Sequence, residues 1–355
     1  MTSDGTGTGS GKPRQVKCVV WDLDGTIWDG VLLEDAEVVP RASVIAIIRA
    51  LDEVGILHSI SSKNDHELAM RRLREAGIAD YFLYPQINWN PKSDSIQNIA
   101  KSLNIGVDAL AFVDDQEFEL AEVAHALPEV LLVPAGTVTE AAGRPEFRPR
   151  FVTSESRLRR LMYQADASRD VAEQEHRGTS EEFLATLGMR MRISQAGPDD
   201  LPRAEELTLR TNQLNSTGRT FGFEELDALR TSPDHLLLVA SLDDRFGSYG
   251  TIGLALLGTA GPVWRLHLLL MSCRVVSRGV GTVLLNHAMR LASAAGARFQ
   301  ADFVHTGRNR MMYLTYKMAG FSEVDGGNEA DGVVVLESSL DHIQPVPPYL
   351  TLDLG

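Results

Sequence analysis

The sequence is short of cysteine, of long apolar runs and of positive charge, and each shortage excludes a class of protein. Its 355 residues include only two cysteines, Cys18 and Cys273, which cannot build a disulfide framework and favour a reducing compartment. No stretch approaches the roughly 20 consecutive apolar residues of a membrane-spanning helix. The net charge of −14 argues against general nucleic-acid binding, which depends on neutralising phosphates. We therefore expect a cytoplasmic protein with no nucleic-acid partner and no membrane partner.

The length favours two domains, and the first has the pattern of a parallel α/β sheet. The first 15 residues lack the apolar segment of a secretory signal and predict a disordered leader. Between residue 16 and about 135, β-rich runs at 17–21, 56–61, 110–113 and 130–133 alternate with helical periodicity at 43–54, 66–75, 94–103 and 118–126. This alternation predicts a Rossmann-like parallel sheet, in which chemistry gathers beyond the carboxyl ends of the strands.

The rest of the chain predicts a connector and a second α/β domain. Gly and Pro interrupt 136–149, and a charged helix follows from 156 to about 175. Three closely spaced β-rich runs at 236–242, 250–257 and 263–271 are typical of an antiparallel meander. Helices near 280–295 and 309–319 alternate with a strand at 298–304. The predicted divisions are a leader (1–15), a first domain (16–140), a helical connector (141–190), a second domain (191–340) and a tail (341–355).

Two aspartates end the first predicted strand, in the segment VVWDLDGTIWDG. Strand alternation places Asp22 and Asp24 on the same side of the strand end. One carboxylate can attack phosphorus while the other handles the proton of the leaving group, and such a pair needs a hard cation. Asp-Gly pairs are also common in turns, so the pair alone is only moderately specific.

Three further groups follow at later strand ends. Ser62 follows the second strand with Lys63 and Asn64 beside it, Lys92 follows a proline, and Asp114-Asp115 follow the run LAFV. A hydroxyl, an ammonium and carboxylates for a magnesium ion are what phosphoryl transfer requires. Each has an ordinary alternative as a helix cap, a solvated charge or a turn. Because all of these groups follow predicted strand ends, we favour a phosphoryl-transfer site over the separate ordinary explanations.

These four groups resemble the motifs of the haloacid-dehalogenase superfamily over residues 15–135. The resemblance implies Asp22 as the nucleophile and Asp24 as the general acid/base. It implies phosphate ligands at Ser62, Lys63, Asn64 and Lys92, and Mg²⁺ ligands at Asp22, Asp24, Asp114 and Asp115. The short spacing between Gly30 and the next helix leaves room only for a minimal cap.

In the second domain, a thiol precedes a glycine-rich turn. Cys273 and Arg274 end the run LHLLLMSCR, and Arg278-Gly279-Val280-Gly281 opens a helix whose free N–H groups can bind an anion. The arrangement resembles the GNAT acetyltransferases, whose turn grips the diphosphate linked to pantetheine. We expect pantetheine contacts from Arg274, Arg278, Gly279 and Gly281. A free cysteine is usually buried and inert, but Arg274 and the helix N-terminus can favour the thiolate of Cys273. His305 is the candidate base for the Cys273 thiol, because it ends a strand that we expect beside the strand of Cys273. We assign Cys18, the other cysteine, to the core.

The segments VKCVVWDLDGTIWDGVLLED, ISSKNDH, FVDD, LRTNQLNSTG and LLLMSCRVVSRGVG together resemble the FkbH-like proteins of polyketide pathways, over about residues 15–335. The resemblance implies a GNAT-like second domain and transfer of a glyceryl group from 1,3-bisphosphoglycerate, with loss of phosphate, to an acyl carrier protein. The product is a precursor of methoxymalonyl extender units or tetronate starter units. Gly25, where that family usually has Asn, and His305, where Pro is frequent, depart from the pattern.

We interpret the chain as a glyceryl transferase and phosphatase that works through a Cys273 thioester. Asn212, Asn215 and Thr217 are candidate ligands of the glyceryl hydroxyls or the pantetheine, although a capping turn explains them equally well. The arginines crowded between Arg144 and Arg160 form either a solvated helix start or a docking patch for an acidic phosphopantetheinylated carrier. Two alternatives stay open: a stand-alone phosphatase whose second domain is only a lid, and a non-catalytic carrier-docking module.

Overall fold

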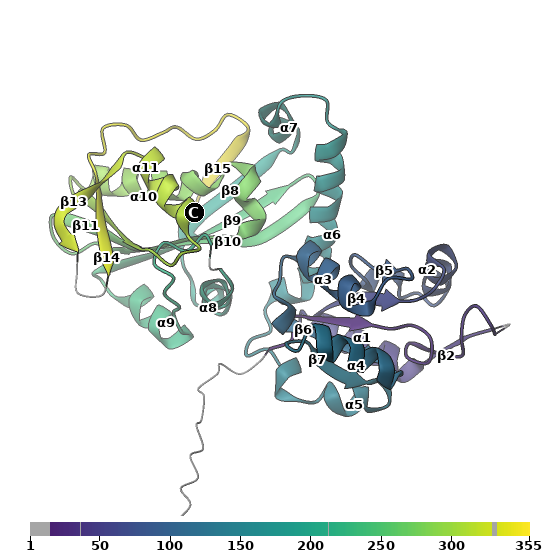
Figure 1. Cartoon of the computed structure of the whole chain (residues 1–355). Coiled ribbons are helices and arrows are strands. Elements are labelled where there is room, and N and C mark those ends of the chain that lie inside the picture. The colour runs from purple at the N-terminus through teal and green to yellow at the C-terminus, as the bar shows by residue number, and fades with distance from the viewer. Residues whose placement is uncertain (1–14, 36, 212, 329–331) are drawn as a thin grey trace, which may run out of the picture. The chain divides into compact units, whose positions relative to one another are not determined.

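The computed structural model describes residues 15–35, 37–211, 213–328 and 332–355. The chain divides into two compact units, Met1–Gln164 and Ala165–Gly355, each built on a sheet of its own (Figure 1). The division falls within helix α6 (Ser154–Glu175), so the predicted connector, 141–190, is shared between the units. All but the last residue of the predicted leader lies outside the described residues.

The first unit contains a parallel sheet of five strands in the order β5-β4-β1-β6-β7. Their bounds are β1 (Cys18–Trp21), β4 (Leu57–Ser62), β5 (Gln86–Ile87), β6 (Leu110–Asp114) and β7 (Leu131–Pro134). Counted in chain order the strands run 3-2-1-4-5, so the direction of winding reverses between β1 and β6. In doubly wound sheets ligands bind at this reversal, outside the carboxyl ends of the strands.

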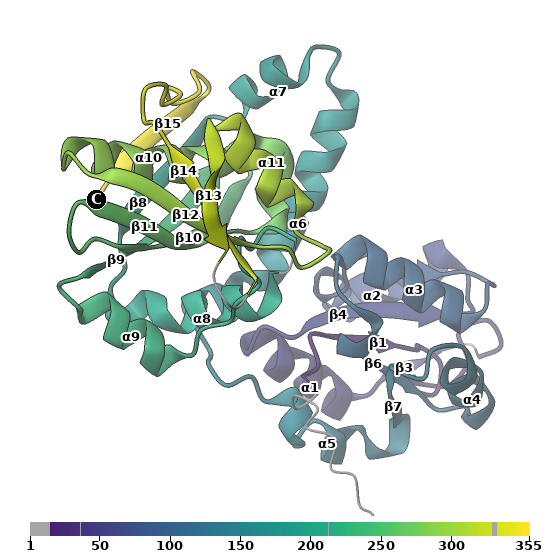
Figure 2. The same cartoon turned by 60° about the vertical axis from the view of Figure 1, so that its left-hand side comes forward.

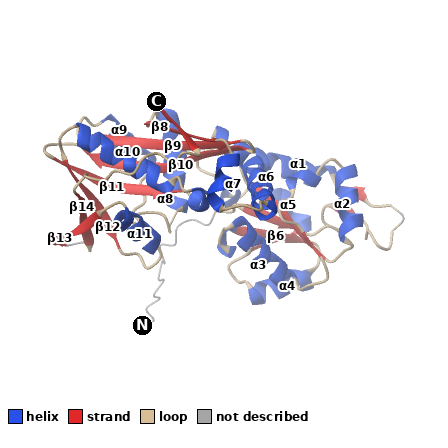
Figure 3. Cartoon of the chain, turned by 90° about the horizontal axis from the view of Figure 1, so that it is seen from above, coloured by secondary structure: helices blue, strands red, loops and turns tan. Residues whose placement is uncertain are grey.

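Helices cover both faces of this sheet (Figure 3). One core holds α1 (Ala42–Glu53), α2 (His66–Glu75) and α5 (Val138–Ala141) against the side chains of Trp21 and Val113. The other holds α3 (Lys92–Leu103) and α4 (Glu117–Ala126) against Val20 and Phe112. Because successive side chains of a strand alternate between faces, both sides of β1 are apolar and fully buried.

Short segments before and after these elements complete the first unit. Between β1 and α1 the described strands are β2 (Trp28–Asp29) and β3 (Val39–Pro40), which form a small hairpin. This confirms the minimal cap. The unit continues past the predicted boundary at residue 140: the Val16 amide donates to the Glu146 carbonyl, and Arg160 of α6 pairs with Asp52 of α1 at 3.0 Å.

The second unit is built on a mixed sheet of eight strands. In spatial order these are β13 (Phe321–Asn328), β14 (Val333–Ser338), β12 (Arg298–Val304), β11 (Val263–Met271), β10 (Gly247–Gly258), β9 (His235–Asp244), β8 (Met189–Gln195) and β15 (Leu350–Leu354). The β9–β10–β11 meander is antiparallel, as predicted. The predicted tail, 341–355, ends in β15, which pairs in parallel with β8 and so extends the sheet.

Helices lie on both sides of this sheet (Figure 2). One core includes side chains of α7 (Ser180–Thr186), α10 (Gly281–Ala294) and α11 (Arg310–Met318); the other includes α8 (Leu201–Arg210) and α9 (Phe223–Thr231). β11 and β12 pair in parallel at their beginnings only. Further along, Ser216 lies between them, since its amide donates to Leu269 and its carbonyl accepts from Val304, each at 3.0 Å. In the described part of the chain, no helix has the length and apolarity to cross a membrane.

Candidate active site

The predicted phosphoryl-transfer residues lie at the carboxyl edge of the first sheet. Asp22 follows β1, Ser62 ends β4 and Asp114 ends β6, while Lys92 begins α3. All four side chains belong to buried residues. β1 is hydrogen-bonded to β4 and β6 in matching register, so the ends of the three strands meet where the winding reverses. The topology therefore gathers groups that are up to 92 residues apart in the sequence.

The ammonium of Lys92 is the centre of this cluster. Its Nζ donates to Asp22 Oδ1 at 2.5 Å, to Asp114 Oδ2 at 3.0 Å and to the Ser61 carbonyl at 2.8 Å. The three donor protons of the ammonium are thus matched by three acceptors. Because Lys92 is only 3% exposed, water screens its charge less than it would at the surface.

Burial also changes the acidity of these groups. Burial raises the pKa of Asp22 to about 7; the charge of Asp114 acts in the same direction, while Lys92 and a hydrogen bond with Ser62 oppose it. Burial lowers the pKa of Lys92, but the two carboxylates outweigh that effect and the pKa lies above its usual value. Lys92 therefore stays charged.

Asp24 is held apart from that cluster by donors of its own. Asp24 Oδ1 accepts from Trp28 Nε1 at 2.7 Å and from the Leu32 amide at 3.1 Å, and Oδ2 accepts from Asn64 Nδ2 at 2.9 Å. Three donors fix the orientation of the carboxylate, as a general acid/base requires. Sequence reasoning missed Trp28; its signal was a tryptophan four residues after the second aspartate, in the cap hairpin.

The ammonium of Lys63, predicted to bind phosphate, faces a carboxylate in this structure. Its Nζ pairs with Glu119 Oε1 of α4 at 2.8 Å. Glu119 is buried and was not foreseen, since nothing local to α4 marks it. In this arrangement the charge of Lys63 is already matched within the protein.

Three carboxylates can hold a divalent metal. Oxygens of Asp22, Asp114 and Asp115 all lie within 4.8 Å of one another, and hard oxygen ligands of this kind suit Mg²⁺. The Asp115 carboxylate packs against Gly25, where an added Cβ would lie 2.3 Å from Asp115 Oδ2. Gly25 also has φ +64°, so glycine fits this position on both counts. The donor set therefore fits Mg²⁺; the carboxylate of Asp24, predicted as a fourth ligand, lies outside this group of three.

In the second unit, the residues predicted to contact pantetheine are tied to groups of the chain itself. Arg274 Nη2 donates to the Tyr249 carbonyl at 2.7 Å. Arg278 pairs with Glu173 of α6 at 2.8 Å. Gly279 has φ +68° and Gly281 begins α10. Cys273 begins a 3-10 helix directly after β11; its side chain lies outside the described part of the structure.

The other predicted residues of the second unit are those expected to bind substrate and the candidate base. Asn215 is fully buried and builds a turn: Oδ1 accepts from the amides of Thr217 and Gly218, and Nδ2 donates to the Arg219 carbonyl. His305 is exposed, with its ring 4.8 Å from that of Phe303. β12, which precedes it, is the parallel neighbour of β11, as expected. Asn212 lies outside the described residues.

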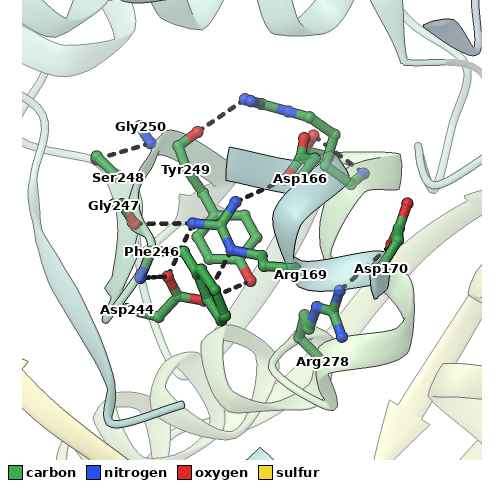
Figure 4. Close-up of polar contacts among 12 residues, drawn as sticks. Asp166, Arg169, Asp170, Asp244, Phe246, Gly247, Ser248, Tyr249, Gly250 and Arg278 are labelled. Atoms are coloured by element: carbon green, nitrogen blue, oxygen red, sulfur yellow. Dashed lines mark hydrogen bonds and ion pairs between the residues drawn. The ribbon is translucent and has the colours of Figure 1, made fainter. Parts of the chain in front are cut away.

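A buried network fastens the second half of α6 to the β9–β10 hairpin (Figure 4). Arg169, with no exposed side-chain surface, donates to both oxygens of Asp244 at 2.8 Å. Its guanidinium also lies 3.7 Å from the centre of the Tyr249 ring and pairs with Asp166 at 2.7 Å. The hydroxyl of Tyr249 donates to Asp244 at 3.0 Å. Each charge in the network thus has a partner, as buried charges require.

No protein-family model and no curated protein matches the chain. Among solved structures, the first unit is similar to the N-terminal part of the protein BF1531 from Bacteroides fragilis, described as containing a phosphatase domain complexed with Mg. The identity is 28%, 36% of this chain and 39% of that chain are covered, and the TM-score is 0.34. The chain thus spans about two fifths of that structure's length.

Two other structures, both of acetyltransferases, are each similar to 43% of the chain. One is the ribosomal-protein-S18-alanine N-acetyltransferase from Escherichia coli, with 15% identity, 43% and 96% coverage of this chain and that chain, and a TM-score of 0.34. The other is a putative phosphinothricin N-acetyltransferase, with 19% identity, 43% and 99% coverage and a TM-score of 0.32. The strand orders define the fold class as α/β, with a five-stranded parallel sheet followed by an eight-stranded mixed sheet.

Proposed function

We propose that the chain is a bifunctional glyceryl transferase and phosphatase of the FkbH-like kind. It loads the glyceryl group of 1,3-bisphosphoglycerate onto the phosphopantetheine thiol of an acyl carrier protein, with loss of phosphate, for a polyketide pathway. The observation that carries the proposal is the Lys92 ammonium, buried between Asp22 and Asp114 with Ser62 beside them. This arrangement supports phosphoryl transfer, and the resemblance of the whole chain supplies the glyceryl chemistry.

The phosphatase half uses Asp22 and Asp24. An Asp22 oxygen attacks the phosphorus of the phosphate ester, the bond from phosphorus to the alcohol oxygen breaks, and Asp24 gives that oxygen a proton. Water then attacks the aspartyl phosphate and gives a proton to Asp24, which releases inorganic phosphate and restores both residues. Lys92 offsets the charge of the transferring group. A bound Mg²⁺, held by Asp22, Asp114 and Asp115, supplies further neutralisation of that charge.

The transfer half uses Cys273. Its thiolate attacks the acyl carbon of the bisphosphate, the bond to the phosphate oxygen breaks, and one phosphate leaves with the electron pair. The carrier thiol then attacks the thioester; its proton passes, through a base for which His305 is the candidate, to the departing Cys273 sulfur. Exchange between two thioesters is nearly isoenergetic, so alignment and oxyanion stabilisation are the main requirements.

Intact-protein mass spectrometry tests both halves, with 1,3-bisphosphoglycerate, Mg²⁺ and a phosphopantetheinylated carrier. The wild-type chain should add a glyceryl group to the carrier. Cys273→Ala should end loading, whereas Cys18→Ala, which alters the other cysteine, should preserve it. Asp22→Asn should leave a phosphoglyceryl group on the carrier or enzyme. Normal loading by Cys273→Ala contradicts the covalent route, and a dephosphorylated product from Asp22→Asn contradicts the role of Asp22.

A stand-alone Mg²⁺-dependent phosphatase is the second candidate. It is favoured by the ion pair between Arg278 and Glu173, which engages the arginine predicted to bind pantetheine. This candidate predicts fast phosphate release from small phosphate esters without any carrier, and no change in the mass of the carrier. The same assay, run with and without carrier protein, separates the two candidates.

A further inference from the structure

Two histidines lie side by side at one end of the β9–β10–β11 meander. His235 begins β9, and His267 lies within β11. The centres of their two rings are 6.2 Å apart. Neither half of the proposed reaction uses them. Imidazole is the commonest metal ligand in proteins, so the positions of the four ring nitrogens decide what this pair can bind.

A glycine on the strand between them gives the two rings room to approach. Gly258, the last residue of β10, pairs with His235 of β9. Residues directly opposite each other on antiparallel strands point to the same face of the sheet. A Cβ added to Gly258 would lie 2.7 Å from His267 Nε2. His267 Nε2 therefore occupies the space of the missing side chain, on the same face as His235 and next to it.

The Nδ1 atom of each ring is engaged by a neighbouring side chain. His267 Nδ1 lies 2.9 Å from Asp302 Oδ2, and because an ionised carboxylate can only accept, this Nδ1 carries the proton. Arg265 Nε donates to the other oxygen of Asp302 at 2.6 Å. His235 Nδ1 lies 3.0 Å from Ser232 Oγ. The lone pair of His267 is thus on Nε2, and no hydrogen bond to either Nε2 is found among the described residues.

The spacing of the rings is within the range that one shared ion allows. Metal–nitrogen bonds are about 2.1 Å long, so an ion bound to Nε2 lies about 3.2 Å from the ring centre. Two rings that share an ion then have centres at most about 6.4 Å apart, and about 5 Å apart in tetrahedral geometry. The observed 6.2 Å is inside this limit, and a small rotation of the rings gives the tetrahedral spacing. Water can complete the coordination, because the His267 side chain is 35% exposed.

We propose that His235 and His267 form a binding site for one divalent transition metal ion of the zinc–copper class, with Asp302 orienting His267. A carboxylate that accepts from the second nitrogen of a histidine fixes the tautomer of that ligand in metal sites. Imidazole suits Zn²⁺, Ni²⁺ and Cu²⁺, whereas the oxygen ligands of the first unit suit Mg²⁺. The bound ion joins the start of β9 to β11 across β10, and it stabilises the folded protein because it binds that state preferentially.

Calorimetric titration of Zn²⁺ into the untagged full-length protein, with excess Mg²⁺ to fill the oxygen site, tests this assignment. Wild type should bind Zn²⁺ at this site, and His235→Gln and His267→Gln should each weaken that binding at least about tenfold, because one of two ligands is lost. Asp302→Asn should weaken it by roughly tenfold, the usual effect of losing such an outer partner. His342→Gln, which changes an exposed histidine of the same unit, should bind as wild type does.

Gly258→Ala tests the geometry without removing a ligand. Its Cβ would take the space of His267 Nε2, so we expect at least about tenfold weaker Zn²⁺ binding. Gly136→Ala is the matched control, because a Cβ there meets nothing within 4 Å and neither glycine has a positive φ. Cu²⁺ bound to wild type should show two nitrogen ligands by electron paramagnetic resonance, and one in His235→Gln.

Equal Zn²⁺ affinities in wild type and in a folded histidine variant overturn the inference, and so does unchanged affinity in Gly258→Ala. If His267→Gln does not fold, His235→Gln decides alone, because the partly exposed His235 ring can be replaced without opening the core. These titrations need neither carrier protein nor substrate. Their result therefore stands whether or not the proposed function is correct.

Discussion

The ammonium of Lys92 lies between two carboxylates that are almost entirely buried, those of Asp22 and Asp114. In Lys92→Met these carboxylates would face each other without a cation. We expect the free energy of unfolding to fall by about 3–5 kcal/mol, the usual cost of leaving a buried charge unpaired, and phosphate release to fall roughly 10²–10³-fold. Urea unfolding and a phosphate-release assay measure the two effects.

The dependence of stability on Mg²⁺ gives a second test with the Lys92→Met variant. Because Mg²⁺ can take over part of the neutralisation, adding MgCl₂ should restore more stability to Lys92→Met than to the wild type. Lys101→Met, which alters an exposed lysine of the same helix, should change neither stability nor activity appreciably. Wild-type stability of Lys92→Met in the absence of Mg²⁺ would contradict the account.

Gly25 and Gly77 form a matched pair for testing the metal site. Both have φ near +65°, at +64° and +67°, but a Cβ on Gly25 would meet Asp115 at 2.3 Å whereas one on Gly77 would meet nothing within 4 Å. Alanine at either position should lower stability by about 1–2 kcal/mol, because the left-handed backbone is strained for other residues. Only Gly25→Ala should also weaken Mg²⁺ binding, since it displaces the Asp115 carboxylate. Equal Mg²⁺ affinities in calorimetry would disprove the contact.

At the scale of elements, α6 is anchored to the β9–β10 hairpin through Arg169 and Asp244, and this anchor should depend on pH. Burial raises the pKa of Asp244, but the hydrogen bonds and charge of Arg169 outweigh it, so the pKa lies below its usual value, about 3.9. The folded state therefore binds the proton less tightly than the unfolded state does. The stabilisation is complete above the unfolded pKa and is lost as the pH falls below about 3.9 towards the folded pKa.

Asp244→Asn removes this titration. In urea titrations between pH 5 and pH 3, the variant should lose less stability than wild type, although it is less stable at pH 7. Asp243→Asn, at the exposed neighbouring position of β9, should keep the wild-type profile. Parallel pH profiles for wild type and Asp244→Asn would show that the ion pair contributes nothing to the acid sensitivity.

The elements that the sequence predicts best are those with long, regular patterns. α2, β11 and β12 have the bounds expected from periodicity, because each has one consistently apolar face. The two-residue strands of the cap hairpin and β15 carry no such pattern; pairing with distant segments defines them.

The same limit applies to the site: Asp22, Ser62, Lys92 and Asp114 lie at or after strand ends and were predictable. Glu119 and Glu173 reach their partners only through tertiary packing, so no local pattern marks them.

For the whole molecule, the proposed chemistry requires one carrier to meet two sites in different units. A phosphoglyceryl group loaded through Cys273 is covalently held by the carrier and can leave the enzyme with it. The phosphatase site of any chain can then act on it, since its cap is only a small hairpin. The two activities therefore need not reside on the same polypeptide during one round of loading.

Mixing two inactive variants tests this independence. Asp22→Asn should load phosphoglyceryl onto the carrier but not remove the phosphate, and Cys273→Ala should remove phosphate but not load. An equimolar mixture should yield the dephosphorylated glyceryl carrier, at a rate that rises with enzyme concentration because the loaded carrier must diffuse between chains. The mass of the carrier over time measures this. If each variant retains its own half-reaction yet the mixture accumulates only phosphoglyceryl carrier, then the two steps must occur on one chain before the carrier dissociates.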